Sequence, residues 1–211
     1  MKSLNKSVLI IATLFFSTLS QANLITNGSF EDNNVNESTW SLFKASDVNS
    51  WESASIEIWN SLKGVHALDG ENHLELNAHP YTGVAFELSQ QFNTQLDQQY
   101  TLDFAYRARK NNNESFKVDV LSDGNNVFSM IFDDHTKNAW STFSGVFTAT
   151  GNITNLIFTS ITPNASVGNF LDAIVVEEYL QVTPNVGHVS SPASFLLLLL
   201  AAPLLLARKK K

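Results

Sequence analysis

The sequence predicts an all-β protein that folds as a jelly-roll β-sandwich. Apolar and polar residues alternate over many short runs between residues 23 and 180, which is typical of half-buried strands. Turn-forming residues separate these runs at short intervals, and helical periodicity is absent from this region. Short strands at regular spacing favour a sandwich over an α/β fold.

The first strand is expected at Asn23 to Glu31, where Gly28 introduces a kink and Phe30 returns to the core. We expect this strand to pair with residues 170–178 near the end of the domain. Residues 122–126, Ser-Asp-Gly-Asn-Asn, predict a hairpin between two apolar runs. Residues 33–50 and 60–70 are expected to be long loops. The remaining strands are predicted at 56–59, 72–77, 83–92, 100–107, 115–121, 127–132, 140–150, 153–161 and 170–179.

Both ends of the chain carry apolar runs with the features of export signals. Residues 1–22 contain Lys2 and Lys6, then VLIIATLFF, then Ser-Gln-Ala, which is the pattern of a secretory signal peptide cleaved before Asn23. A membrane-spanning anchor is the alternative, but the run is shorter than the roughly 20 residues that a span needs. Residues 23–181 are then expected to form one domain, joined to the tail by a linker at 182–191.

The C-terminal residues 189–211 consist of VSSPAS, an apolar run and four basic residues. They resemble the PEP-CTERM signals of exopolysaccharide-producing Gram-negative bacteria. The resemblance implies transient anchoring by the C-terminal helix, recognition by an exosortase-like peptidase, and a final place at the cell surface, outer membrane or extracellular matrix. An uncleaved tail anchor is the alternative. Ser190 and Ser191 replace the usual Pro-Glu, and the matching positions are Val189, Pro192, Ala193 and Ser194.

The net charge limits the classes of partner that the domain is expected to bind. The whole chain has a formal net charge of −7, but six of its thirteen basic residues lie in the two tails. The region between the tails has seven basic and twenty acidic residues, which leaves a net charge of −13. Such a surface repels nucleic acid and anionic lipid, and it favours divalent cations. The chain has no cysteine, so disulfides and thiolate metal sites are excluded.

Seven short motifs follow one another along nearly all of residues 23–180. They are NLITNGSFE from residue 23, Trp40, Trp51, IEIW from 56, ALDGENHLELNA from 67, FAYRAR from 104 and FLDAIVVEE from 170. In their order and spacing these motifs resemble the galactose-binding-like β-sandwiches, in particular family 4, 9, 16 and 22 carbohydrate-binding modules and the domain of unknown function 642.

The resemblance implies a structural calcium ion held by Glu31, just after the first strand, and by Asp172 in the last strand. Hard cations prefer carboxylate and carbonyl oxygens, and two neighbouring terminal strands can supply them. In the alternative interpretation, both side chains are ordinary solvated carboxylates at the edge of the sheet.

A second candidate site follows from the alternation along the strands. If Ile56 and Ile58 point into the core, the residues between and after them point outward. An aromatic ring can stack on a sugar, while carboxylates, amides and guanidinium groups bind its hydroxyls. The alternative is a salt-bridge network around Arg107 with a half-buried Trp59. Glu87 has the same parity, and the candidate ligand-binding residues are Glu57, Trp59, Glu75, Asn77 and Arg107.

Other chemistry has weaker support. Histidines 66, 73 and 79 crowd one region with Tyr81, but their spacing matches no zinc motif. Trp40, Trp51 and Tyr81 could line a cleft, although tryptophan in a sandwich more often belongs to the core. We therefore expect an exported, non-catalytic protein that binds carbohydrate or associates with exopolysaccharide. The alternatives are a structural or adhesive matrix protein that binds other proteins, and a glycoside-active enzyme that uses Glu57 and Glu75.

Overall fold

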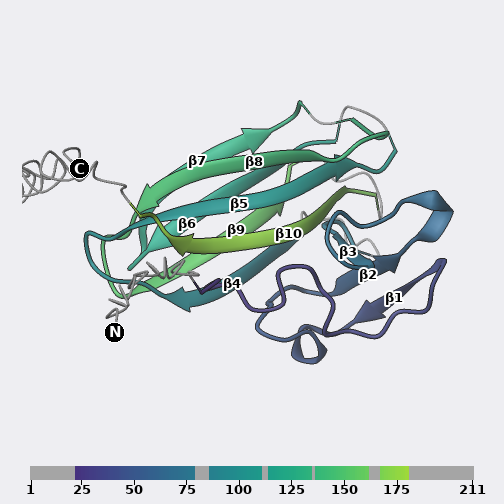
Figure 1. Cartoon of the computed structure of the whole chain (residues 1–211), viewed down its shortest axis with the longest axis horizontal. Coiled ribbons are helices and arrows are strands. Elements are labelled where there is room, and N and C mark those ends of the chain that lie inside the picture. The colour runs from purple at the N-terminus through teal and green to yellow at the C-terminus, as the bar shows by residue number, and fades with distance from the viewer. Residues whose placement is uncertain (1–21, 79–85, 111–113, 135, 162–166, 181–211) are drawn as a thin grey trace, which may run out of the picture. The chain divides into compact units, whose positions relative to one another are not determined.

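The computed structural model describes residues 22–78, 86–110, 114–134, 136–161 and 167–180 (Figure 1). It confirms the predicted β-sandwich of two antiparallel sheets. The chain divides into two compact units, of which the first ends at Tyr179 and the second begins at Leu180. The predicted signal peptide, linker and sorting tail lie outside the described residues, apart from Ala22. In the described ranges, no helix has the length and apolar character required to cross a membrane.

The two sheets differ in size. The larger sheet contains β1 (Thr39–Phe43), β2 (Ile56–Asn60), β3 (Asn72–Glu75), β10 (Asn169–Glu178), β5 (Gln99–Ala108) and β8 (Ser141–Thr148), in that spatial order. The smaller sheet contains β4 (Glu87–Asn93), β9 (Ile153–Ser160), β6 (Phe116–Ser122) and β7 (Asn125–Phe132). Two short 3-10 turns, η1 (Ala45–Asp47) and η2 (Leu62–Gly64), lie in the loops after β1 and β2.

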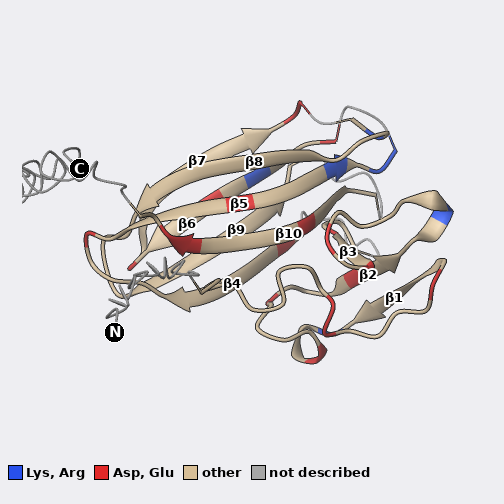
Figure 2. Ribbon diagram, viewed as in Figure 1, with Lys and Arg blue, Asp and Glu red and all other residues tan. Residues whose placement is uncertain are grey.

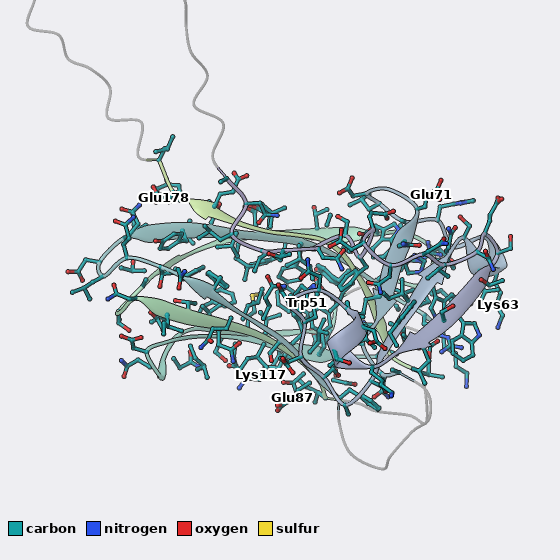
Figure 3. All side chains as sticks on the ribbon, turned by 90° about the horizontal axis from the view of Figure 1, so that it is seen from below. Trp51, Lys63, Glu71, Glu87, Lys117 and Glu178 are labelled. Carbon is teal, nitrogen blue, oxygen red and sulfur yellow. The ribbon has the colours of Figure 1, made fainter. Side chains whose placement is uncertain are left out.

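The core lies between the sheets and is rich in aromatic rings. Phe104 of β5 contacts Phe116 of β6 and Phe158 of β9 at ring-centroid distances of 6.2 and 5.3 Å. Strand β6 alternates strictly between buried and half-buried residues, as expected for one face on the core and one toward solvent. Trp51 also lies in the interior (Figure 3), where its Nε1 donates a hydrogen bond of 3.0 Å to the Asn27 carbonyl.

The N-terminal segment differs from the predicted first strand. No regular strand is present between residues 23 and 31, but the segment does lie against β10, as expected. Leu24 N donates to Val176 O at 2.8 Å, and Ile174 N donates to Gly28 O at 3.0 Å. The ladder does not continue, because Asn27 and Phe30 have φ values of 51° and 60° and turn the chain away from the sheet.

The loops show one further difference. Residues 33–50 were expected to be a loop, but they contain β1, which pairs with β2. The predicted hairpin is confirmed, since Ser122 pairs with Asn125 across the two-residue turn Asp123–Gly124. Both turn residues have positive φ, 46° and 81°, which is the conformation that Asp-Gly hairpin turns adopt.

Strands β2 and β3 are buried on both faces, unlike the other strands. Every residue from Ile56 to Asn60 and from Asn72 to Glu75 is buried. One face of these strands packs on the core through Ile58 and Leu74. The opposite face therefore carries buried polar side chains, and these residues build the candidate site.

Candidate functional site

The strand register gathers four of the five sequence-predicted ligand residues on the outer face of the larger sheet. Glu57 lies opposite Glu75, and Trp59 lies opposite His73. Phe170 of β10 lies opposite both Glu75 and Arg107. Because directly opposite residues of antiparallel strands share a face, all these side chains face away from the core. Glu87 does not belong to this group, since β4 lies in the other sheet.

The expected open surface is wrong for four of the five predicted residues. The exposed fractions are 2% for Glu57, 2% for Trp59, 1% for Glu75 and 0% for Asn77. Two hydrogen bonds satisfy polar groups among these buried side chains. Trp59 Nε1 donates to Glu57 Oε1 at 2.7 Å, and Asn77 Nδ2 donates to Val167 O at 3.1 Å. Trp59, which lines the pocket described below, forms the floor of the site. The other three side chains are buried, and together the four do not form an exposed sugar-stacking surface.

The guanidinium group that completes the floor belongs to Arg109 and not to Arg107. Arg109 Nη1 donates to both carboxylate oxygens of Glu75, at 2.5 and 2.6 Å. Its Cζ lies 4.8 Å from the centre of the Trp59 ring, within the range of a cation–π contact. Arg107 instead donates from Nε to the Lys137 carbonyl at 2.9 Å. Glu75, Arg109 and Trp59 thus hold one another in place.

Burial of the Glu75 carboxyl makes its ionisation unfavourable. Burial raises its pKa to about 8, although Arg109 and the Gly168 amide, which donates at 3.0 Å, both favour the ionised form. The neighbouring Glu57 adds to the rise. A carboxyl whose folded pKa exceeds its unfolded value opposes folding once it ionises. Glu75 therefore stabilises the domain less as the pH rises from about 4.5 to about 8.

His73 lies in an aromatic cage beside this group. Its ring centre is 4.7 Å from that of Phe170, 5.6 Å from that of Trp140 and 6.2 Å from that of Trp59. Neither ring nitrogen has a hydrogen-bond partner within the described residues. Burial, helped by the charge of Arg107, lowers the pKa of His73 to about 3, so its imidazole is neutral at physiological pH.

A pocket of about 470 Å³ opens above this floor. Its accessible walls include two exposed lysines, Lys63 in the β2–β3 connection and Lys110 just after β5. The Glu114 carboxylate fixes the chain after β5, because it accepts hydrogen bonds from the amides of Arg109 and Lys110 at 2.6 and 2.8 Å. The described residues that line it are Trp59, Lys63, Val65, Arg109, Lys110, Val167 and Phe170.

The two predicted calcium ligands lie around one loop, which connects η2 to β3. Glu31 Oε1 accepts hydrogen bonds from the amides of Glu71 and Asn72 at 2.8 and 2.7 Å. Asp172 Oδ2 accepts from the amides of Leu68 and Asp69 at 2.6 and 3.0 Å. Both carboxylates thus fix the loop through its backbone; Glu31 is exposed to solvent, whereas Asp172 is buried.

Asp172 is fully buried, and burial raises its pKa to about 7 against the effect of its amide donors. The nearby Asp69 adds to the rise and itself accepts a hydrogen bond of 2.6 Å from Ser29. In the part of the chain that the structure describes, no group of three or more His, Cys, Asp or Glu side chains could hold a metal ion. His66 bonds Ser61 at 3.2 Å, whereas His79 and Tyr81 lie outside the described residues.

Comparison with known families decides the classification of the chain. The family described as "Protein of unknown function (DUF642)" matches residues 23–177. The chain belongs to this family. No curated protein matches this DUF642 chain.

Solved structures match the DUF642 sandwich at low identity. A structure titled "Family 16 Carbohydrate Binding Module-2" has a TM-score of 0.50 and 17% identity, and the match covers 73% of this chain and 99% of that one. A family 61 module, TmCBM61 in complex with beta-1,4-galactotriose, has a TM-score of 0.49 and 17% identity over 75% of this chain and 99% of that one. Only the fold follows from likeness at this identity.

Bacteriophage CBA120 tailspike protein 4 also matches, with a TM-score of 0.48 and 15% identity over 74% of this chain. The DUF642 chain spans only 21% of the length of that tailspike chain.

Of the described residues that line the DUF642 pocket, sequence reasoning predicted only Trp59. Arg109 and Lys110 lie at the end of β5 within or next to the FAYRAR motif, and the period-two alternation that selects Arg107 selects Arg109 equally. Phe170 is the first residue of the FLDAIVVEE motif, but no aromatic side chain was expected on the outward face of that strand. Lys63 lies in an irregular connection and carries no periodic signal. Trp40 and Trp51, which were also considered as cleft residues, differ in exposure. Trp51 is a core residue, whereas Trp40 is 41% exposed on the edge strand β1.

Proposed function

We propose that the pocket above Trp59 and Arg109 binds a carbohydrate and that the protein is a non-catalytic binding module. The observation that carries this proposal is the Glu75–Arg109–Trp59 group, which fixes a guanidinium group on the floor of an open pocket. A fixed donor binds a hydroxyl without losing side-chain freedom at that moment. Val65 and Val167, which are half-buried, supply apolar walls for the C–H surface of a sugar ring.

Retention on polysaccharide tests this proposal. Val65 is half-buried and lines the pocket, so Val65→Trp is expected to fill it and to reduce retention at least about tenfold. The probes are insoluble cellulose, xylan, galactan and polygalacturonate, with the full chain in a pull-down assay. Trp59→Ala is also expected to abolish retention, because it removes the surface on which Arg109 rests.

Val146→Trp is the matched control, since Val146 is 45% exposed on β8 and does not line the pocket. It should retain the wild-type behaviour. The rival interpretation is a structural or adhesive matrix protein without a sugar site. Failure of the wild type to bind any probe, or unchanged binding by Val65→Trp, would favour this rival.

A glycoside-active enzyme is the second candidate, because two carboxyl groups lie side by side and one has a raised pKa. The geometry argues against it. Glu75 is held by Arg109 and the Gly168 amide, and Glu57 accepts the Trp59 indole N–H. Both side chains are at least 98% buried and therefore lack room for an attacking water. Release of reducing sugar from a bound polysaccharide would restore the enzyme interpretation.

We propose that calcium supports the loop between η2 and β3. The support for this is that Glu31 and Asp172 place two carboxyl groups on this loop, and calcium also accepts backbone carbonyl oxygens and water as ligands. A chelator is then expected to lower the melting temperature of the wild type by several degrees. Asp172→Ala should remove this sensitivity. A wild type that melts at the same temperature with and without chelator would leave hydrogen bonds as the only role of these carboxylates.

We further propose that the protein is exported and kept at the cell surface or in an exopolysaccharide matrix. The support is the signal pattern of residues 1–22 and the PEP-CTERM-like tail of residues 189–211. Mass spectrometry of the exported form should place its N-terminus at Asn23. An intact residue 1 on the exported protein would refute the signal peptide, and an intact tail would refute processing by an exosortase-like peptidase.

A further inference from the structure

Basic residues gather at one end of an otherwise acidic domain. The region between the tails has only seven lysines and arginines against twenty acidic residues. Most of the basic residues lie where β5 ends and around the β2–β3 connection (Figure 2). The five in this group are Lys63, Arg107, Arg109, Lys110 and Lys137.

Three of the five line the pocket, and two of these keep an uncompensated charge. Arg109 donates hydrogen bonds to Glu75 and forms an ion pair with it once that carboxyl ionises. Lys63 and Lys110 are exposed and form no ion pair with any described residue. In a domain with nearly three acidic residues for every basic one, two unpaired lysines on the walls of one pocket require an explanation.

The carboxyl groups of Glu57, Glu75 and Glu114 accept hydrogen bonds from groups other than Lys63 Nζ and Lys110 Nζ. Glu75 bonds Arg109 and the Gly168 amide, and Glu57 accepts the indole N–H of Trp59. Glu114 accepts the amides of Arg109 and Lys110 and so lies beneath the chain after β5. Among the described residues, the side chains that line the pocket are therefore basic or apolar.

The backbone presents Lys63 in an unusual conformation. Ser61 and Lys63 have φ values of 51° and 55°, in the left-handed region that non-glycine residues seldom adopt. The β2–β3 connection places Lys63 on the wall of the pocket, which Lys110, just after β5, also lines. A flexible surface lysine would need no such conformation.

Because salt screens distant charges, the charges nearest to a bound group have the largest effect on its binding. At physiological ionic strength, charges further apart than about 8 Å interact weakly, so a bound group senses the pocket lysines more than the acidic surface beyond them. The acidic surface still opposes a long, densely charged polyanion, because such a chain must cross it. A polymer with one charge per sugar unit, seated unit by unit in the pocket, suits this distribution.

We propose that the pocket selects a negatively charged sugar unit, namely the carboxylate of a uronic acid in an acidic polysaccharide. Lys63 and Lys110 bind the carboxylate, and Arg109 binds neighbouring hydroxyls. This inference rests on the proposed carbohydrate-binding function and adds the class of ligand.

The test compares acidic polymers with their neutral esters. Polygalacturonate and alginate, each with its methyl ester, are titrated with the full chain at low and high salt. The acidic forms are expected to bind at least about tenfold more tightly than the esters, and high salt should remove most of this difference. The double variant Lys63→Gln/Lys110→Gln should lose about tenfold in affinity for the acidic forms.

The control is Lys44→Gln/Lys117→Gln, which removes the same charge elsewhere. Lys117 pairs with Asp119 on β6 and lies apart from Lys63 (Figure 3), and this variant should bind within about twofold of the wild type. Equal affinity for acid and ester, with both double variants unaffected, would overturn the charge selection while the sugar site stands. Absence of binding to every polymer, neutral or acidic, would overturn the proposed function as well.

Discussion

Arg109→Leu is expected to destabilise the domain by an amount that depends strongly on pH. At pH 6 the Glu75 carboxyl is protonated, because its pKa is about 8, and the loss should be only about 1 kcal/mol. Above pH 8 the wild-type carboxylate ionises against Arg109, whereas the variant must keep it protonated or bury an unpaired charge. Each pH unit above 8 should then add about 1.4 kcal/mol, and the loss at pH 10 should reach about 4 kcal/mol.

Urea denaturation of the wild type and the variant at pH 6 and pH 10 measures this effect. The matched control is the double variant Glu75→Gln/Arg109→Leu, which removes the titrating group. Relative to Glu75→Gln alone, it should lose a small and pH-independent amount of stability. A loss from Arg109→Leu that is equal at both pH values would contradict the coupling of Glu75 to Arg109.

Gly28→Ala is expected to cost about 3 kcal/mol, although it adds only one methyl group. A Cβ at this position would lie 2.0 Å from the carbonyl oxygen of Ile174 and 3.0 Å from its carbonyl carbon. Both atoms are backbone atoms of β10, and the Ile174 amide donates to Gly28 O in the same contact. The N-terminal segment must therefore move away from β10, and Phe30, which is fully buried, would move with it.

Gly124→Ala provides the comparison for this prediction. Gly124 has a φ of 81° in the β6–β7 hairpin turn, but no atom lies within 4 Å of the added Cβ. Its cost should be near 1 kcal/mol, from backbone conformation alone. Equal unfolding free energies for the two variants in urea would show that the contact between Gly28 and β10 is not tight.

Period-two alternation predicted most of the fold and part of the site. It placed β5, β6, β9 and β10 within one or two residues, and it put Glu57 and Glu75 on one outward face. The alternation gives only the side of a sheet on which a residue lies. It gives no information on whether another part of the chain covers that side, and so the outward residues of β2 and β3 were expected to be exposed.

The irregular parts of the chain were the least predictable. Asn23 to Glu31 has the composition of a strand, but positive φ values at Asn27 and Phe30 end its pairing with β10 after a few residues. β1 was missed because Thr39–Phe43 lies at the edge of the sheet and exposes Trp40 and Leu42, so it lacks a clean apolar alternation. Lys63 was missed for a related reason, since turn residues carry no periodic signal.

The most direct measurement of ligand binding at the pocket is the indole N–H spectrum of the four tryptophans during titration with oligogalacturonate and neutral oligosaccharides. Trp59 lines the pocket, whereas Trp51 is buried in the core and bonded to Asn27. Binding at the pocket predicts a saturable shift of the Trp59 resonance and an unchanged Trp51 resonance. Saturable binding that leaves Trp59 unshifted would contradict the assignment of the pocket as the sugar site.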